Sequence, residues 1–494
     1  MSKIRVRFAP SPTGLLHIGS LRTALYNFLF AKHHLGDFLL RIEDTDRARF
    51  VEGGVKNILE SLNWGKTVPD EGPYLNGDEI LEKGDKGPYV QSARLDLYHK
   101  YADELLASGK AYHCFCTAER LEEMRAAQVA SKLPPMYDGL CRTLSREDVQ
   151  AKLALNIPYV VRFAIPKDRA ISFEDLVRGQ VSFESNTVDD QVLVKSDGFP
   201  TYHLASIVDD HLMEITHVLR SEEWLTSTPK HILLYEAFGW KAPEFAHLPQ
   251  LLNPDRTKLS KRQGDVAALD YRDAGYLPEA VINFIALLGW TPEEGREIYS
   301  LEELVKLFDI CKIAKAGAVF NREKLDWFNG QYLRALDSAE LKRRLQDFAA
   351  LSKIELIDLD KSFANPELAL KAASERAVTL KDVIASLDLL ALKLDYQAVS
   401  LVWAKSDEVT AKRALSEIAT WLLEKDENGW VEAALEIDIK EWIKAQGFEN
   451  GAVLWPLRVA LSGQEKSAPP FTLLEILGKA ESLGRIQAAL KFLG

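Results

Sequence analysis

The chain has 494 residues, of which 47% are hydrophobic and 27% are charged, and its formal net charge is −12. Because a single hydrophobic core rarely exceeds about 250–300 residues, this length predicts several domains. The acidic balance excludes a protein that binds nucleic acid over its whole surface, and it confines any such site to a local basic patch with salt-sensitive affinity.

The sequence also bears on the cellular compartment. No apolar run approaches the roughly 20 residues of a membrane span, and the first residues lack the apolar core of a secretion signal. Four cysteines are too few for a disulfide framework in a chain of this size. We expect no membrane association and a cytoplasmic location, with an organelle matrix as the alternative.

The first elements in chain order predict an open α/β sheet. Lys3–Phe8 alternates charged and apolar residues like a strand, Ser20–His34 has apolar residues at helical spacing, and Phe38–Ile42 is a second apolar strand. Ligands of such sheets bind beyond the carboxyl ends of the strands. The Pro10–Gly19 turn and the acidic stretch Glu43–Asp46 both follow strand ends, so we expect them to line a ligand site.

The pattern changes further along the chain. Pro69–Tyr89 is rich in Gly, Pro, Asp and Glu, which predicts an exposed loop. Tyr112–Asn186 interrupts the α/β pattern, after which Gln191–Leu204 and Glu214–Leu219 look like strands again. From about Leu301 onward, amphipathic segments predict an almost entirely helical C-terminal region.

Phe8–Ser20 has the composition of a nucleotide-binding turn. Gly14 and Gly19 let the backbone approach a ligand closely, and the N-terminus of the following helix offers N–H groups to a phosphate. His17 places a hydrogen-bond donor beside that position. The simpler interpretation is a strand-to-helix turn capped by a histidine.

A second candidate is the segment Lys258–Arg262. Lys258 and Lys261 flank Ser260, and a loop with two lysines can close over a pyrophosphate leaving group, whose charge grows in the transition state. A solvated basic loop is the alternative interpretation.

These two segments resemble the HIGH and KMSKS motifs of class I aminoacyl-tRNA synthetases. Their order and spacing are similar to those of bacterial-type glutamyl-tRNA synthetases, and the resemblance extends over essentially the whole chain. It implies a multidomain α/β plus all-α protein with a Rossmann-type catalytic domain. The implied divisions are the two catalytic halves 1–111 and 189–250, an acceptor-stem-binding insertion 112–188, a stem-contact domain with the KLSKR loop 251–328, and helical anticodon-binding subdomains 329–393 and 394–494.

The resemblance implies an ATP-dependent ligase. Glutamate would be activated to glutamyl-adenylate and then transferred to the 3′-terminal adenosine of tRNA(Glu), with Mg²⁺ on the phosphates and the enzyme acting as a monomer. The implied catalytic residues are His17, Gly19, Lys258 and Lys261. The implied ATP-binding residues are these four with Pro10, Ser11, Gly14 and Ser260.

A glutamate pocket must hold a side-chain carboxylate, and a buried carboxylate favours arginine as its partner. Arg7 and Arg220 are the candidates, and a structural ion pair is the alternative interpretation of each. In the family, matching arginines contact glutamate and an acidic residue matching Glu43 takes its ammonium group. Other positions that match the pocket are Ala9, Ser11, Tyr202 and Trp224.

Three cysteines raise the question of zinc. Cys114 and Cys116 form a C-x-C pair, closer than the usual C-x₂₋₄-C spacing, and Cys141 follows. Tyr137 is a candidate fourth ligand through its oxygen, as in a related paralogue type. A reduced, metal-free knuckle is the alternative.

Two arginines near the C-terminus match family positions that read the anticodon. Arg458 lies in a stretch resembling an anticodon-contact motif, and Arg376 aligns with a position linked to the rejection of glutamine tRNA. Two other functions stay open: an enzyme of relaxed specificity that also glutamylates glutamine tRNA, and a catalytically silent tRNA-binding relative.

Overall fold

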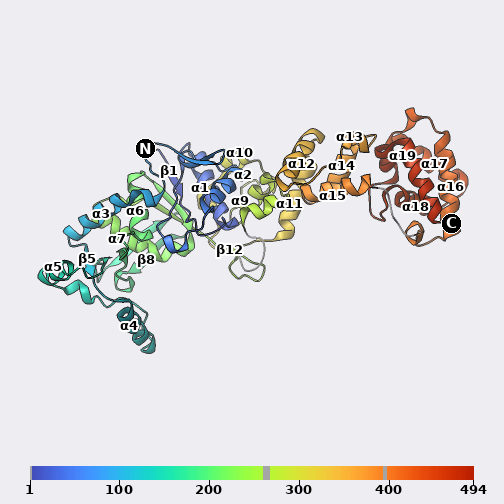
Figure 1. The fold of residues 1–494 in the computed structure, drawn as a ribbon. Helices are drawn as coiled ribbons and strands as arrows, with labels where there is room; N and C mark the ends of the chain where they lie inside the picture. The colour runs from blue at the N-terminus through green and yellow to red at the C-terminus, as the bar shows by residue number, and fades with distance from the viewer. Residues whose placement is uncertain (1–2, 260–266, 393–397, 494) are drawn as a thin grey trace. The chain divides into compact units, whose positions relative to one another are not determined.

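The computed structural model describes residues 3–259, 267–392 and 398–493. The chain forms two compact units: Met1–Tyr271 with Val281–Asn321, and Arg272–Ala280 with Arg322–Gly494. Within the described residues, no helix is both long enough and apolar enough to cross a membrane. Figure 1 shows a mixed α/β N-terminal part in blue to green and helices alone in orange to red.

A six-stranded sheet forms the centre of the first unit, in the order β2-β1-β10-β11-β7-β8. All neighbours are parallel except β7 and β8, which are antiparallel. The predicted α/β opening is therefore confirmed. The strands are β1 (Arg5–Phe8), β2 (Asp37–Leu40), β7 (Ala170–Asp175), β8 (Gly179–Glu184), β10 (His217–Ser221) and β11 (Glu244–Leu248).

The order of these strands determines where a ligand can bind. β1 lies between β2 and β10 in the sheet. The chain passes from β1 through α1 to β2, and it reaches β10 much later. Loops that leave the carboxyl ends of strands on either side of such a point diverge and open a crevice. The turn after β1 and the end of β10 therefore border the same crevice, although about 200 residues separate them.

Helices cover the first unit, and buried apolar side chains such as Val6, Phe38 and Leu39 pack beneath them. These helices are α1 (Ile18–His33), α2 (Gly54–Trp64), α3 (Leu95–Ala107), α4 (Ala118–Ala130), α5 (Arg146–Ala154), α6 (Tyr202–Leu212), α7 (Thr228–Phe238), α8 (Ala268–Asp273), α9 (Pro278–Ala286) and α10 (Leu301–Leu307). A short pair, β12 (Leu251–Leu252) and β13 (Ala318–Val319), lies outside the main sheet.

A smaller antiparallel sheet consists of β5 (Ala111–Cys114), β6 (Val160–Phe163) and β9 (Val192–Val194). β7 and β8 fall inside the predicted insertion 112–188 but belong to the main sheet, where β7 pairs with β11 and β8 pairs with β7. The predicted division into domains stays a prediction. Of the strand expected over Gln191–Leu204, only β9 is a strand; a turn follows it, and residues 202–204 begin α6. The apolar residues that follow Tyr202 recur at helical spacing and are buried.

The loop expected over Pro69–Tyr89 contains a β-hairpin of β3 (Gly72–Asn76) and β4 (Glu79–Lys83). Gly77 has a φ of 62° in the two-residue turn. A glycine at the first position of a two-residue turn is a hairpin signal, here Gly77 before Asp78, and the overall polar composition hid it.

The second unit is helical, as predicted, and encloses one extended apolar core. Its packing follows from amphipathic segments whose apolar faces meet, as in α15 (Leu380–Ala391) and α16 (Glu408–Glu424), where every buried residue is Leu, Ile, Val or Ala. The helices are α11 (Arg322–Ala335), α12 (Ser338–Ser352), α13 (Leu359–Ser362), α14 (Pro366–Arg376), α15 (Leu380–Ala391), α16 (Glu408–Glu424), α17 (Glu432–Gln446), α18 (Asn450–Ser462) and α19 (Pro470–Phe492).

Candidate functional site

A cleft of about 690 Å³ opens at the carboxyl edge of the main sheet. A second pocket of about 350 Å³ shares His17 with it and is also lined by Gly19 and Lys258. The predicted Ser260 and Lys261 lie outside the described residues. The other predicted residues that line the larger cleft are Arg7, Ala9, Pro10, Ser11, Gly14, Glu43, Tyr202, Arg220 and Trp224.

His17 caps the N-terminus of α1. Its Nδ1 accepts a hydrogen bond of 2.9 Å from the backbone N–H of Gly19. An accepting Nδ1 carries no proton, so the neutral ring holds its proton on Nε2 and can donate there. A Cβ atom at Gly19 would stand 3.1 Å from the imidazole Nδ1, so a side chain at this position would press on the ring.

The N-terminus of α1 has no acidic residue in its first turn. The dipole of this helix favours an anion at its N-terminus, and His17 stands at the same end. Gly14, with a φ of 148°, lets the preceding loop turn at the edge of the cleft. This corner of the site suits a phosphate group.

Lys258 follows a tight turn after β12 and forms an ion pair with Glu223. Both side chains are about half exposed, at 56% and 46%. Exposed pairs of this kind contribute little stability, so the Lys258 ammonium can exchange this partner for a phosphate at low cost. Glu223 itself lines both pockets.

Arg7 belongs to a buried charge network. Its Nε donates to Asp210 at 3.0 Å, and Arg41 donates to the same Asp210 oxygen at 2.7 Å. Burial opposes the charge on Arg7, but Asp210 outweighs it and the pKa of Arg7 is raised. The terminal nitrogens of Arg7 have no hydrogen-bond partner in the described part of the chain, and they line the cleft.

Glu43 lies at the other side of this network, 5% exposed. Arg41 donates to its Oε1 at 3.0 Å, and its second oxygen accepts no hydrogen bond within the described ranges. Burial raises the pKa of Glu43, against the lowering effects of Arg41 and Arg7. A ligand cation beside Glu43 would stabilise the ionised carboxylate.

Arg220 is held differently from Arg7, because all five of its N–H groups donate to neutral acceptors. No Asp or Glu oxygen lies within 4.0 Å of it among the described residues, so its charge has no direct counter-ion. The acceptors are His247 Nε2 (3.1 Å), Tyr202 Oη (3.0 Å), His231 Nδ1 (3.0 Å), Thr228 Oγ1 (2.9 Å) and the Trp224 carbonyl (3.4 Å).

Tyr202 and Trp224 complete the wall of the cleft near Arg220. Their rings lie 4.1 Å apart between centroids at an angle of 38°. Both residues line the cleft, whereas His231, His247 and Thr228 lie behind Arg220 and are fully buried. A ligand carboxylate that enters from the side of Tyr202 and Trp224 can therefore bind Arg220 by replacing one of these two residues as its acceptor.

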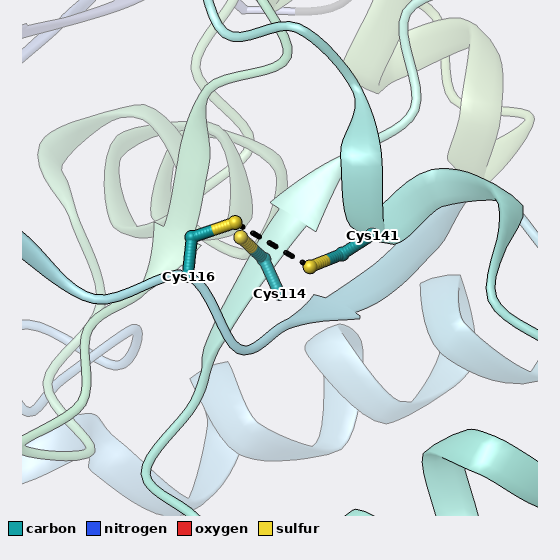
Figure 2. Close-up of side chains that lie close together, drawn as sticks. All are labelled: Cys114, Cys116 and Cys141. Carbon is teal, nitrogen blue, oxygen red and sulfur yellow. Dashed lines mark hydrogen bonds between the residues drawn. The ribbon is translucent and has the colours of Figure 1, made fainter. Parts of the chain in front are cut away.

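Cys114, Cys116 and Cys141 converge in the first unit, and Figure 2 shows their sulfur atoms facing one another. Their sulfurs lie within 4.8 Å of one another, and those of Cys116 and Cys141 are 3.5 Å apart. Tyr137 Oη is 3.4 Å from two of the sulfurs. Tetrahedral zinc–thiolate bonds of about 2.3 Å set sulfurs about 3.8 Å apart, so the three sulfurs suit zinc in type and spacing.

Arg376 and Arg458 belong to the second unit, at the end of α14 and within α18. Burial lowers the pKa of Arg458, and the positive charge of Arg376 lowers it further. The Nε of Arg458 is buried and has no hydrogen-bond partner among the described residues. A partly buried cation beside a second cation favours a bound anion.

Sequence reasoning overlooked several residues of the site. Arg41 was taken only as part of a strand, yet it is fully buried and joins Glu43 to Asp210. His231 and His247 belong to no motif, so no local signal pointed to them. A charged residue within an apolar strand, as at Arg41, is a signal that could have been used, because buried charges require partners.

Comparison with known proteins agrees with this geometry. Residues 3–327 match the catalytic domain of the class I tRNA synthetases (E and Q), and residues 325–490 match an anticodon-binding domain. Glutamate–tRNA ligases of Clostridioides difficile and Alkaliphilus metalliredigens are 45% and 44% identical, over 98% and 99% of this chain and of their own. A crystal structure of a glutamate tRNA ligase from Elizabethkingia meningosepticum, in complex with its amino acid, superposes with a TM-score of 0.88 at 40% identity, covering 100% of both chains. The chain therefore belongs to the glutamate–tRNA ligases, a family of class I aminoacyl-tRNA synthetases.

Proposed function

We propose that the chain joins glutamate to glutamate tRNA at the expense of ATP. The observation that carries this proposal is the cleft itself. Arg7, Arg220 and Glu43 provide two cationic groups and one anionic group, the charges that complement a glutamate zwitterion, next to the phosphate corner at His17. The full-length likeness to glutamate–tRNA ligases supports the same substrate.

In the first step, the α-carboxylate of glutamate attacks the α-phosphate of ATP in line, and pyrophosphate leaves. ATP enters as its Mg²⁺ complex, in which the ion neutralises part of the phosphate charge. His17 Nε2–H and the N-terminus of α1 stabilise charge on the reacting phosphate, and Lys258 with Lys261 stabilises the leaving pyrophosphate. Pro10, Ser11, Gly14, Gly19 and Ser260 complete the ATP site.

In the second step, the terminal adenosine hydroxyl of the tRNA attacks the mixed anhydride and releases AMP. The adenylate is already activated, so no covalent enzyme nucleophile is required. Positioning of the two reactants and stabilisation of charge account for the catalysis.

Each group of glutamate has a proposed partner. Arg7 and Arg220 hold the side-chain carboxylate, and Glu43 accepts from the ammonium group. Ala9, Ser11, Tyr202 and Trp224 form the rest of the pocket wall. The α-carboxylate remains free to reach the phosphate, so only this carboxylate reacts.

We propose further that the enzyme acts as a monomer in the cytoplasm. The finer division of its chain is proposed from the family: an insertion at 112–188 that binds the acceptor end, a stem-contact domain at 251–328, and anticodon-binding subdomains at 329–393 and 394–494.

Charging assays test the function directly. Purified glutamate tRNA and glutamine tRNA are each offered glutamate and glutamine, and pyrophosphate exchange is followed with and without tRNA. We expect glutamate on glutamate tRNA only. Glutamate on both tRNAs would establish the relaxed enzyme, and the absence of charging and exchange would leave a silent tRNA-binding protein.

The cysteine cluster provides a second test. We propose that Cys114, Cys116, Cys141 and Tyr137 hold a structural zinc ion, which would cross-link β5 to the segment around residue 141. Protein purified without chelators should contain about one zinc per chain, and Cys116→Ser should lower this content and the thermal stability. Cys311→Ser is the matched control, because Cys311 is exposed and lies outside the cluster. A wild-type zinc content near zero, with all four thiols titratable in the wild type and three in Cys311→Ser, would establish a metal-free knuckle.

We propose that Arg376 and Arg458 contact the anticodon. Arg458→Ala should raise KM for glutamate tRNA about tenfold or more, because the tRNA loses a cation that contacts it. Arg413→Ala is the control, since Arg413 lies in the same unit but pairs with Glu417 on the surface. An unchanged charging efficiency would remove Arg458 from the tRNA site.

A further inference from the structure

We infer that His231 and His247 are positioning residues that hold the Arg220 guanidinium between neutral acceptors and deny it a protein counter-ion. The side-chain carboxylate of the amino acid substrate then becomes that counter-ion. This inference rests on the proposed role of Arg220 in binding glutamate. It adds a reason why the pocket selects an anionic side chain over an amide of the same shape.

The register of the main sheet places Arg220, His247 and Asp175 on neighbouring strands. Arg220 on β10 lies directly opposite His247 on β11, and Asp175 lies at the end of the next strand, β7. His247 Nδ1 is 2.6 Å from Asp175 Oδ2, and the other Asp175 oxygen accepts from the backbone N–H groups of Val177 and Arg178. Because a carboxylate only accepts, His247 holds its proton on Nδ1 and offers a lone pair on Nε2 to Arg220.

His231 presents a second lone pair from α7. Arginine can only donate, so the 3.0 Å contact with Arg220 requires an unprotonated Nδ1 on His231. The His231 proton then lies on Nε2 and is donated to His203 Nδ1 at 3.1 Å. Burial holds the pKa of His231 well below its usual value and that of His203 at about 3, so both rings stay neutral.

The choice of histidine rather than a carboxylate has a chemical consequence. Asp175 stabilises the orientation of Arg220 through His247 but stays outside ion-pair distance of the guanidinium, whereas Arg7 shares Asp210 directly. A buried cation without a counter-ion gains strongly from a bound carboxylate and much less from a neutral amide. Arg220 thus discriminates between glutamate and glutamine, because the two neutral histidines orient the guanidinium without neutralising its positive charge.

The isosteric pair His231→Asn and His231→Asp tests charge at constant shape. In Asn the Oδ1 replaces Nδ1 as a neutral acceptor, so we expect KM for glutamate within about threefold of wild type. In Asp a carboxylate neutralises Arg220, so we expect KM for glutamate to rise about 30-fold or more with kcat little changed, and the preference for glutamate over glutamine to narrow. KM for ATP should stay constant in both variants.

A second pair of variants, at His247, tests the orientation of the Arg220 guanidinium. His247→Leu removes the acceptor and should raise KM for glutamate about tenfold, and His247→Gln, whose Oε1 replaces Nε2, should restore it. Thermal unfolding of every variant checks the fold, and this pair decides the question if His231→Asp does not fold.

Arg220→Leu distinguishes the binding of glutamate by Arg220 from the positioning of Arg220 by the two histidines. If this substitution leaves KM for glutamate unchanged, the proposed role of Arg220 fails. The other case is that Arg220→Leu raises KM for glutamate, while this KM is the same in His231→Asp as in His231→Asn and the same in His247→Leu as in His247→Gln. Arg220 then binds glutamate but the histidines do not position it, and the inference is overturned.

Discussion

Replacement of Arg7 by glutamine should raise KM for glutamate about 100-fold or more, because the loss of one partner of a buried, hydrogen-bonded charge pair costs several kcal/mol. The terminal nitrogens of Arg7 line the cleft and have no partner among the described residues, so their hydrogen bonds are available to the substrate. Arg41 also donates to Asp210 and keeps that carboxylate paired in the variant. The fold should therefore survive.

Arg5→Gln is the matched control for this experiment. Arg5 lies on the same strand and is tied to Asp37 and Glu71 rather than to the cleft. We expect this variant to lose stability without a change in KM for glutamate. Steady-state charging with saturating tRNA and ATP measures both variants, and equal KM values for Arg7→Gln and wild type would place Arg7 outside the glutamate pocket.

His17→Asn should lower the rate of adenylate formation about 100- to 1000-fold, the usual cost of removing one preorganised donor from a developing charge. Asparagine is a good N-cap, and its Oδ1 can accept from the backbone N–H of Gly19 as Nδ1 does. It lacks a donor at the position of Nε2–H. The substitution therefore separates the structural role of His17 from its catalytic role.

Pyrophosphate exchange in the presence of tRNA measures this rate, and thermal unfolding measures the cap. We expect an unfolding temperature close to that of wild type for His17→Asn and a lower one for His17→Ala, with similar losses of activity. If His17→Asn retained full activity, His17 would act only as a cap.

Local patterns made the phosphate corner predictable. The Phe8–Ser20 turn and α1 are contiguous in sequence, and their composition alone indicates a strand, a glycine-containing turn and a helix. The β3–β4 hairpin and the start of α6 were missed for the opposite reason. A polar average masked the Gly77-Asp78 turn, and the apolar residues after Thr201 fit a strand or a buried helix equally well.

Contacts between distant strands could not be read from sequence. Asp175 and His247 are 72 residues apart, and only the order of β10, β11 and β7 brings them to Arg220. The same holds for Arg41 and Asp210, which are 169 residues apart. Sequence motifs identify the residues that the chemistry requires. The hydrogen-bond acceptors that orient these residues depend on the order of strands in the sheet.

The shortness of β1 bears on which changes in chain length the enzyme can tolerate. Its four residues pair with β2 on one side, from Arg5 opposite Asp37 to Phe8 opposite Leu40, and with β10 on the other. Successive side chains of a strand alternate between faces, so the loss of one residue ahead of Arg7 would turn that side chain away from the cleft. The turn of the β3–β4 hairpin, by contrast, is free to vary in length. Evolutionary insertions and deletions should therefore accumulate at that turn and be absent from β1.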